Sequence, residues 1–405
     1  FMGRNAGGGT WADAASNYNI AIGGLSMDDA LNGALGNTSL GYYTLSGVNT
    51  GDYNTAVGYQ AGINVSTGGN NTYVGKDTGF QMRSGSMNIA IGDSALYTSR
   101  GSSNNVAIGP SAGQNITTGG NNVLLGYKAG FAQKTQSSVI AIGYEAMGGD
   151  AGTMEGYDIA IGYRSMFQAR DGANGTAIGN STLENYVGSY TVAVGGETGR
   201  YASGSYNTFL GYSSGKGGTT SAPFSSGEQN TALGWNALLN FTTGEKNVAV
   251  GPNALSNVST GYRNIGIGDR ANQGVSTGHS NVSIGYLAGY GGNTSGNVSI
   301  GAEALFTANG SANVAVGMEA GRYTTANDGV WVGKSAGSTG AGGGQSVIVG
   351  YYAGRYIVGS KVVHVGRYAG HYATGSDNTF VGYNAGLGGT TSAPFSSGIN
   401  NVAVG

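Results

Sequence analysis

One pentapeptide recurs along the whole chain and limits what the chain can fold into. Its form is Asn, a β-branched residue, a small residue, an aliphatic residue and Gly, as in Asn54-Thr55-Ala56-Val57-Gly58. It occurs 23 times, and 18 of the 22 intervals between closing glycines are 16 or 17 residues, the others being 18, 19, 23 and 23. Such a short, regular period indicates a solenoid, in which each repeat is one turn of a coil. The 81 glycines alone would favour a disordered chain, but a disordered chain would not be expected to show such regular spacing.

Each repeat has room for short strands and turns but not for a pair of helices. The residue before the closing Gly is always Val, Ile or Leu, and the residue three before it is always Val, Ile or Thr. Alternation with period two indicates a strand with one buried face, so we expect these two rows to point inward. A small residue recurs three positions after the Gly, as at Ala61 and Ala95, and predicts a second, thinner strand facing the first. The predicted fold is an all-β parallel β-roll of about 23 rungs.

The opening Asn and the closing Gly both favour structural roles. Asn opens 16 of the 23 copies and Asp158 opens one more. Stacked side-chain amides can form a hydrogen-bonded ladder, which we favour over a row of ligand-binding amides. We expect the Gly at a tight or left-handed corner where a Cβ would clash. The Gly-rich phosphate-loop pattern ending in Lys and Ser or Thr is absent, so the sequence does not indicate a phosphate site.

The middle residue of the pentapeptide is expected to point away from the interior. It is Ala, Ser or Gly in 16 of 23 copies and is never Asp, Glu, Lys or Arg. A small, apolar, outward column predicts another backbone packed against it, hence a cyclic homo-oligomer and most simply a homotrimer. On this orientation Ala249→Glu should leave the core of a monomer intact yet prevent trimers, whereas Val250→Asp should stop assembly because it buries an unpaired charge in every chain. Representatives of this oligomer-facing column are Ala56, Ala107, Ala249, Ala315, Trp331 and Phe380.

The repeats divide the chain into an irregular lead-in at 1–18 and a continuous solenoid at 19–405. The two 23-residue intervals carry matching inserts at 216–229 and 387–400. Solenoid inserts lie on the surface and often on a binding face, so receptor contact is one interpretation. Packing of the insert aromatics against a neighbouring chain is the favoured one. The residues concerned are Pro223, Phe224, Pro394 and Phe395. Tyr often follows the closing Gly, and such rows either stack on sugars or, as we favour, stiffen the coil.

Composition argues against several classes of function. The 405 residues include no Cys, so thiolate metal sites, disulfides and thiol nucleophiles are excluded. Net charge is −2, which gives no basic field for nucleic acid, and no apolar run is long enough for membrane insertion in this segment. His279, His364 and His371 lack metal-ligand spacing. We therefore expect no catalytic, cofactor or metal site, and a protein that is not an enzyme.

The segment Asn54-Thr55-Ala56-Val57-Gly58-Tyr59-Gln60-Ala61-Gly62 resembles a known repeat class. It is similar to the left-handed parallel β-roll repeats of trimeric autotransporter adhesin heads. It resembles more closely the repeats of bacteriophage tail fibres, including those of cyanophages, and the likeness spans 19–405. The resemblance implies a left-handed roll, a homotrimer, and a fibre that reaches a cell surface.

The expected function is therefore the shaft of a phage tail fibre that serves host attachment. A bacterial trimeric adhesin head and a self-polymerising extracellular filament remain alternatives. An ice-binding solenoid ranks low, because Thr55, Thr72 and Thr208 fall in the row expected to face inward. The expected partners are further copies of the chain and an unidentified surface glycan or protein receptor. The expected location is a virion or a cell surface. Since the sequence does not begin with Met, we also expect it to be part of a longer protein.

Overall fold

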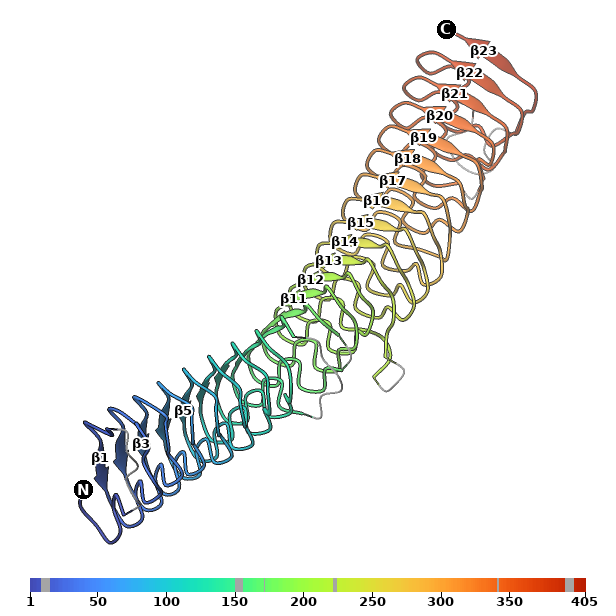
Figure 1. The fold of residues 1–405 in the computed structure, drawn as a ribbon. Helices are drawn as coiled ribbons and strands as arrows, with labels where there is room; N and C mark the ends of the chain where they lie inside the picture. The colour runs from blue at the N-terminus through green and yellow to red at the C-terminus, as the bar shows by residue number, and fades with distance from the viewer. Residues whose placement is uncertain (9–14, 150–155, 171, 221–223, 341, 390–396) are drawn as a thin grey trace. The chain divides into compact units, whose positions relative to one another are not determined.

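The computed structural model describes residues 1–8, 15–149, 156–170, 172–220, 224–340, 342–389 and 397–405. The chain forms two compact units, Phe1–Arg200 and Tyr201–Gly405. Each unit is a parallel β-solenoid with one three-residue strand per turn, and the described residues contain no helix. Within each unit the strands follow one another along one side of the coil (Figure 1). The predicted all-β parallel solenoid is confirmed.

All 23 pentapeptides form strands at the predicted positions. The first unit contains β1 (Ile20–Ile22), β2 (Thr38–Leu40), β3 (Thr55–Val57), β4 (Thr72–Val74), β5 (Ile89–Ile91), β6 (Val106–Ile108), β7 (Val123–Leu125), β8 (Ile140–Ile142), β9 (Ile159–Ile161), β10 (Thr176–Ile178) and β11 (Val192–Val194). The second contains β12 (Thr208–Leu210), β13 (Thr231–Leu233), β14 (Val248–Val250), β15 (Ile265–Ile267), β16 (Val282–Ile284), β17 (Val298–Ile300), β18 (Val314–Val316), β19 (Val330–Val332), β20 (Val347–Val349), β21 (Val363–Val365), β22 (Thr379–Val381) and β23 (Val402–Val404). Equivalent repeat positions pair without offset, as Ala90 does with Ala107.

The orientation expected for these strands is wrong. The middle residue of each strand points into the coil, and the Val, Ile, Leu and Thr residues on either side of it point outward. The supposed oligomer-facing residues are buried inside their own chain, with nothing exposed except 6% of Phe380; they are Ala56, Ala107, Ala249, Ala315, Trp331 and Phe380. Alternation separates two faces without saying which one is internal. The narrow coil admits the small row, so the aliphatic rows lie outside.

The segment after the closing Gly is not the second strand that the small-residue row predicted. Residues with positive φ alternate with ordinary ones, as at Gln60 (φ 56°) and Gly62 (φ 62°). The N–H groups of these two left-handed residues point to opposite neighbouring turns, so Gln60 N donates to Tyr42 O and Gly62 N donates to Thr78 O. The left-handed residues prevent β geometry. The small residue of this segment does point inward as expected, and Ala61 is fully buried.

The predicted corner and ladder are both confirmed. Gly58 has a φ of 136°, and a Cβ there would lie 2.5 Å from the carbonyl oxygen of Gly75 in the next turn. Asn54 Nδ2 donates to Asn37 Oδ1 at 3.1 Å and to Gly68 O at 2.9 Å. Asn54 N also donates to Asn37 Oδ1 at 2.8 Å. Each such amide joins two turns and closes the loop of its own turn.

The ends of the predicted regions differ from expectation in two places. Met2 pairs in parallel with Ile22, so residues 1–8 already belong to the coil rather than to an irregular lead-in. In the first insert the chain has rejoined the coil by Ser225, which pairs with Ala202. In the second insert the structure describes 387–389 and 397–400.

Candidate functional site

The outward residues of the strands form an extended apolar surface in each unit, here called the apolar sheet face. It comprises the first and third residue of every strand. All 46 of these residues, two from each of the 23 strands, are Ile, Val, Leu or Thr, and 39 are aliphatic. They are half-buried or exposed, with 53% of Ile20 and 47% of Leu40 accessible. A charged side chain never interrupts the two rows.

This face is large for a surface left in water. With strands ~4.8 Å apart and ~3.3 Å per residue, the eleven or twelve strands of a unit present roughly 500 Å² of projected area. The largest apolar patch of a typical monomer is about 300–600 Å² and is often functional. The face of each unit therefore has the size of a functional patch, and its chemistry is that of a subunit contact.

Exposed tyrosines follow the closing glycines and stack from turn to turn. The rings of Tyr127 and Tyr144 lie 5.1 Å apart, and those of Tyr144 and Tyr163 lie 5.4 Å apart in near-parallel planes. Tyr42 and Tyr59 repeat the arrangement at 5.8 Å. These rings occupy one another's faces, which supports the interpretation that the rows stiffen the coil.

Asp158 is an exception within the buried ladder. Its Oδ1 accepts the N–H of Gly175 at 2.7 Å, but its Oδ2 is buried without a hydrogen-bond partner. The Asn residues at this repeat position donate an amide N–H that a carboxylate lacks. Burial raises the pKa of Asp158 from 3.8 to about 7, although the Gly175 bond acts in the opposite direction. When Asp158 is protonated, its carboxyl group has an O–H donor in the place where the other turns have the amide N–H of Asn.

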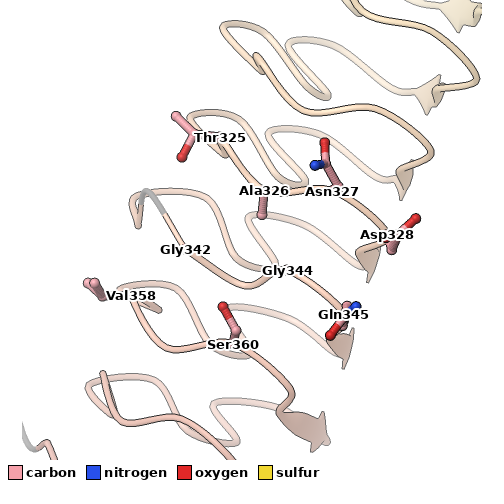
Figure 2. A pocket seen from close by; sticks show the side chains of 9 residues that line it. All are labelled: Thr325, Ala326, Asn327, Asp328, Gly342, Gly344, Gln345, Val358 and Ser360. Carbon is pink, nitrogen blue, oxygen red and sulfur yellow. The ribbon is translucent and has the colours of Figure 1, made fainter.

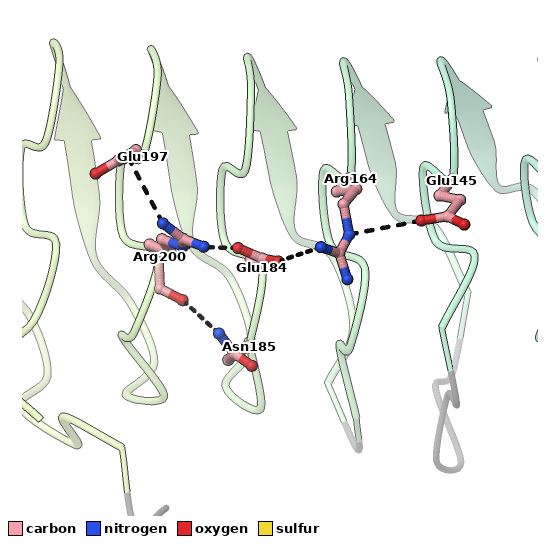
Figure 3. A network of polar contacts seen from close by, with 6 residues as sticks. All are labelled: Glu145, Arg164, Glu184, Asn185, Glu197 and Arg200. Atoms are coloured by element: carbon pink, nitrogen blue, oxygen red, sulfur yellow. Dashed lines mark hydrogen bonds and ion pairs between the residues drawn. The ribbon is translucent and has the colours of Figure 1, made fainter. Parts of the chain in front are cut away.

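Charged side chains in the first unit neutralise one another across successive turns (Figure 3). Glu184 is almost buried and lies 2.7 Å from Arg200 Nε and 3.7 Å from Arg164 Nη1. Arg164 also approaches Glu145 at 3.6 Å, and Arg200 approaches Glu197 at 3.6 Å. Each guanidinium is therefore shared between two carboxylates, which makes this network a structural tie between turns.

The second unit contains one similar tie and one contrasting cluster. Arg322 contacts the carboxylates of Glu303 and Glu319. Arg355, at the same repeat position two turns later, lies instead over aromatic rings, with its Cζ 4.6 Å from the Tyr352 ring centroid. Arg367 likewise lies 5.4 Å from the ring centroid of Tyr351.

A polar hollow of about 480 Å³ lies on the loop side of the second unit (Figure 2). It opens where Gly342 and Gly344 lack side chains, and it is bordered by Asp328, Gln345 and Ser360. In other turns this column carries a side-chain oxygen that accepts an N–H from the preceding turn, as Ser376 Oγ does from Ser360 N. The hollow thus marks a gap in that column.

The three histidines do not gather into a site. His364 is fully buried, its ring stacks on Phe380 at 4.9 Å, and neither ring nitrogen has a hydrogen-bond partner. Burial lowers its pKa from 6.5 to about 4. His371 Nδ1 lies 2.9 Å from Tyr352 O, and His279 stacks on Tyr262. Within the described residues, no three His, Asp or Glu side chains are grouped so as to hold a metal ion.

The insert residues divide between described and undescribed positions. Phe224 is half-buried and its ring stacks on Tyr201 of the same chain, 6.3 Å away, while Ser203 Oγ donates to Phe224 O. Pro223, Pro394 and Phe395 lie outside the described residues. Where the chain is described, it also lacks a helix of the length and apolarity that crossing a bilayer requires.

Sequence reasoning missed the apolar sheet face, although a signal for its direction was present. In all seven repeats with a large middle residue, the fourth residue after the closing Gly is also Gly. Gly79 shows why, because a Cβ there would lie 2.4 Å from the Tyr73 ring. Where that later position is Leu or Met, as at Leu96, the middle residue is Ala or Ser. Such compensation requires both positions to share one interior.

Comparison with known proteins adds no assignment to this picture. Neither a protein-family model nor a curated protein sequence matches the chain.

Proposed function

We propose that this protein is the shaft of a homotrimeric fibre in which the apolar sheet faces of three copies pack around a common axis. The observation that carries the proposal is that both outward rows lack charged side chains and that 39 of their 46 residues are aliphatic. A cyclic trimer covers the face of every copy alike, which accounts for a chain that presents it along both units. The coil supplies its own interior, so a subunit keeps its turns while its outer face binds its neighbours.

The resemblance of the repeats to phage tail fibres supports a shaft that brings a host-binding tip to a cell surface, and hence a place in the virion. A bacterial adhesin head would use the same face. An ice-binding role has less support: Thr55, Thr72 and Thr208 do lie on the outer face, which corrects the orientation expected above, but Thr fills only 7 of the 46 outward positions. We propose neither catalysis nor a cofactor for this segment.

The test is the mass of the assembly in solution. Wild-type protein should sediment as a trimer. Val250→Asp places a carboxylate on the apolar sheet face, and threefold symmetry brings three of them together, so this variant should sediment as a monomer with an unchanged circular dichroism spectrum. Gln229→Glu adds the same charge at an exposed turn and should remain trimeric. A monomeric wild type, or a Val250→Asp variant with the wild-type mass, would overturn the proposal.

A further inference from the structure

Two arginines in the second unit lie on tyrosines without a carboxylate to neutralise them. Among the described residues, no Asp or Glu lies within ion-pair distance of Arg355 or Arg367. Arg355 Nε is buried and lacks a hydrogen-bond partner there. Arg322 occupies the same repeat position as Arg355, but its guanidinium is neutralised by the carboxylates of Glu303 and Glu319. The two unpaired guanidinium groups are available to an external anion.

The tyrosines around these arginines form a fixed platform. Arg355 lies over Tyr352, and Arg367 lies between neighbouring rings, with its Cζ 5.2 Å from the Tyr368 centroid and 6.0 Å from the Tyr383 centroid. The rings brace one another, as in the edge-to-face contact of Tyr351 with Tyr352 at 4.2 Å. The cationic aromatic patch is defined by Tyr351, Tyr352, Arg355, Arg367, Tyr368 and Tyr383. Arg367 is exposed and 37% of Tyr351 is accessible, so the patch meets solvent.

The patch does not compete with the proposed subunit contact. None of its six residues belongs to a strand, so none is part of the apolar sheet face. The segment that carries Tyr352 and Arg355 packs across the interior from β20, because Ala353 is fully buried and shares a core cluster with Ile348. Packing of the apolar sheet faces therefore does not use the patch residues.

We infer that the cationic aromatic patch binds an acidic saccharide that carries a ring carboxylate. A guanidinium fork matches the two oxygens of a carboxylate, and removal from water strengthens the pair. The exposed Tyr rings offer an apolar face to the C–H side of a pyranose and a hydroxyl group to its polar edge. The inference rests on the proposed function, because it assigns the surface contact of the fibre to these residues and to a saccharide partner.

The experiment is calorimetric titration of the whole assembled chain with a tetrasaccharide of galacturonic acid and with its carboxyl-reduced, neutral counterpart. The acidic probe should bind at least ten-fold more tightly, and its affinity should fall as salt is added. Arg355→Gln and Arg367→Gln should each weaken binding by about ten-fold to a hundred-fold. Tyr383→Ala should also weaken it while the affinity difference between the two probes persists.

A matched control separates the patch from general positive charge. Arg263→Gln removes an exposed guanidinium that lies 5.8 Å from the single ring of Tyr262, outside the patch, and it should leave binding unchanged. The inference fails if neither probe binds, if both bind equally, or if Arg263→Gln weakens binding as much as Arg355→Gln. Sedimentation of the same samples reports the trimer separately, so loss of this inference and loss of the proposed assembly are distinguishable.

Discussion

At the scale of single residues, space inside each turn is shared between two positions. Trp331 fits because Gly337 opposes it, and a Cβ on Gly337 would lie 2.3 Å from the indole. Ala249 is instead accompanied by Leu255, which adopts a φ of 51° at the equivalent position. A large residue on one side therefore requires a small one on the other. This relation between the two side-chain sizes holds within one chain and does not depend on assembly.

The exchange can be tested with a double substitution at this pair. Trp331→Ala should leave a cavity and lower stability by about 3–5 kcal/mol. Adding Gly337→Leu to Trp331→Ala should recover part of that loss, because Leu occupies the same backbone conformation at Leu255. Gly337→Leu alone should be destabilising, since it leaves Trp331 in place. The measurement is the melting temperature of the three variants. A double variant no more stable than Trp331→Ala would show that positions 331 and 337 do not share one interior space.

Asp158 makes a second prediction at this scale. Its folded pKa is raised above the unfolded value, so the folded state holds the proton more tightly, and stability should fall as pH rises from about 4 to 7. The limiting slope is about 1.4 kcal/mol per pH unit. Asp158→Asn should remove this pH dependence and be the more stable protein at pH 7. The Asn amide can donate a hydrogen bond to the ladder at any pH, whereas the carboxyl group can donate one only when it is protonated.

His364 has the opposite effect over nearly the same range, because its lowered pKa makes the folded state lose stability as pH falls from 6.5 to about 4. The measurement is therefore the difference in unfolding free energy between wild type and Asp158→Asn at each pH, in which His364 cancels. A difference that stays constant from pH 4 to 7 would show that Asp158 is ionised throughout.

At the scale of the element, the strand positions were predictable and their direction was not. Period and residue type located β14 and its counterparts, because a turn such as that of β14 ends at a Gly whose Cβ would strike the next turn, as at Gly251. The direction of the strands is opposite to the prediction, because alternation separates two faces of a strand without saying which one is internal. The expectations for Ala249→Glu and Val250→Asp therefore exchange places.

This exchange is itself a prediction. Ala249 is fully buried between neighbouring turns, so Ala249→Glu should disrupt the coil and lose its circular dichroism signal as well as its assembly. Val250→Asp should keep that signal. Spectra and melting curves of the two variants, recorded side by side, test the orientation independently of oligomer mass. A folded, monomeric Ala249→Glu protein would restore the opposite orientation.

The segment after each Gly could not be predicted as it is, because its left-handed residues include Gln60, Leu96 and Lys128 as well as glycines. Those side chains carry no local preference for positive φ. Hydrogen bonds to both neighbouring turns impose that conformation, as Gln60 N to Tyr42 O illustrates. The positive φ of these residues therefore follows from the stacking of turns and not from the residue type. The cationic aromatic patch was likewise hard to predict from the sequence, since Arg367 meets Tyr351 and Tyr383 of the neighbouring turns.

At the scale of the whole molecule, each turn depends on its two neighbours, as expected for stacked repeats. A turn should therefore be removable if the remaining ones keep phase. Deleting residues 247–263 joins Lys246 to Asn264, equivalent in the repeat to the present Lys246–Asn247 link, and brings β13 against β15. Leu238 then replaces Leu255 beside Gly266, so the interior keeps the same residue type at that place.

We expect the protein lacking 247–263 to retain the spectrum and the assembly mass of wild type and a melting temperature within a few degrees of it, because copies that lose the same turn still present matching faces. Deleting 247–255 is the control, since the eight residues that it leaves, 256–263, cannot complete a turn and must loop out of the coil. That variant should melt at a lower temperature than the protein lacking 247–263. If both deletions unfold the protein alike, stability does not reside in the contacts between neighbouring turns, and the repeat would have to act through some longer-range order.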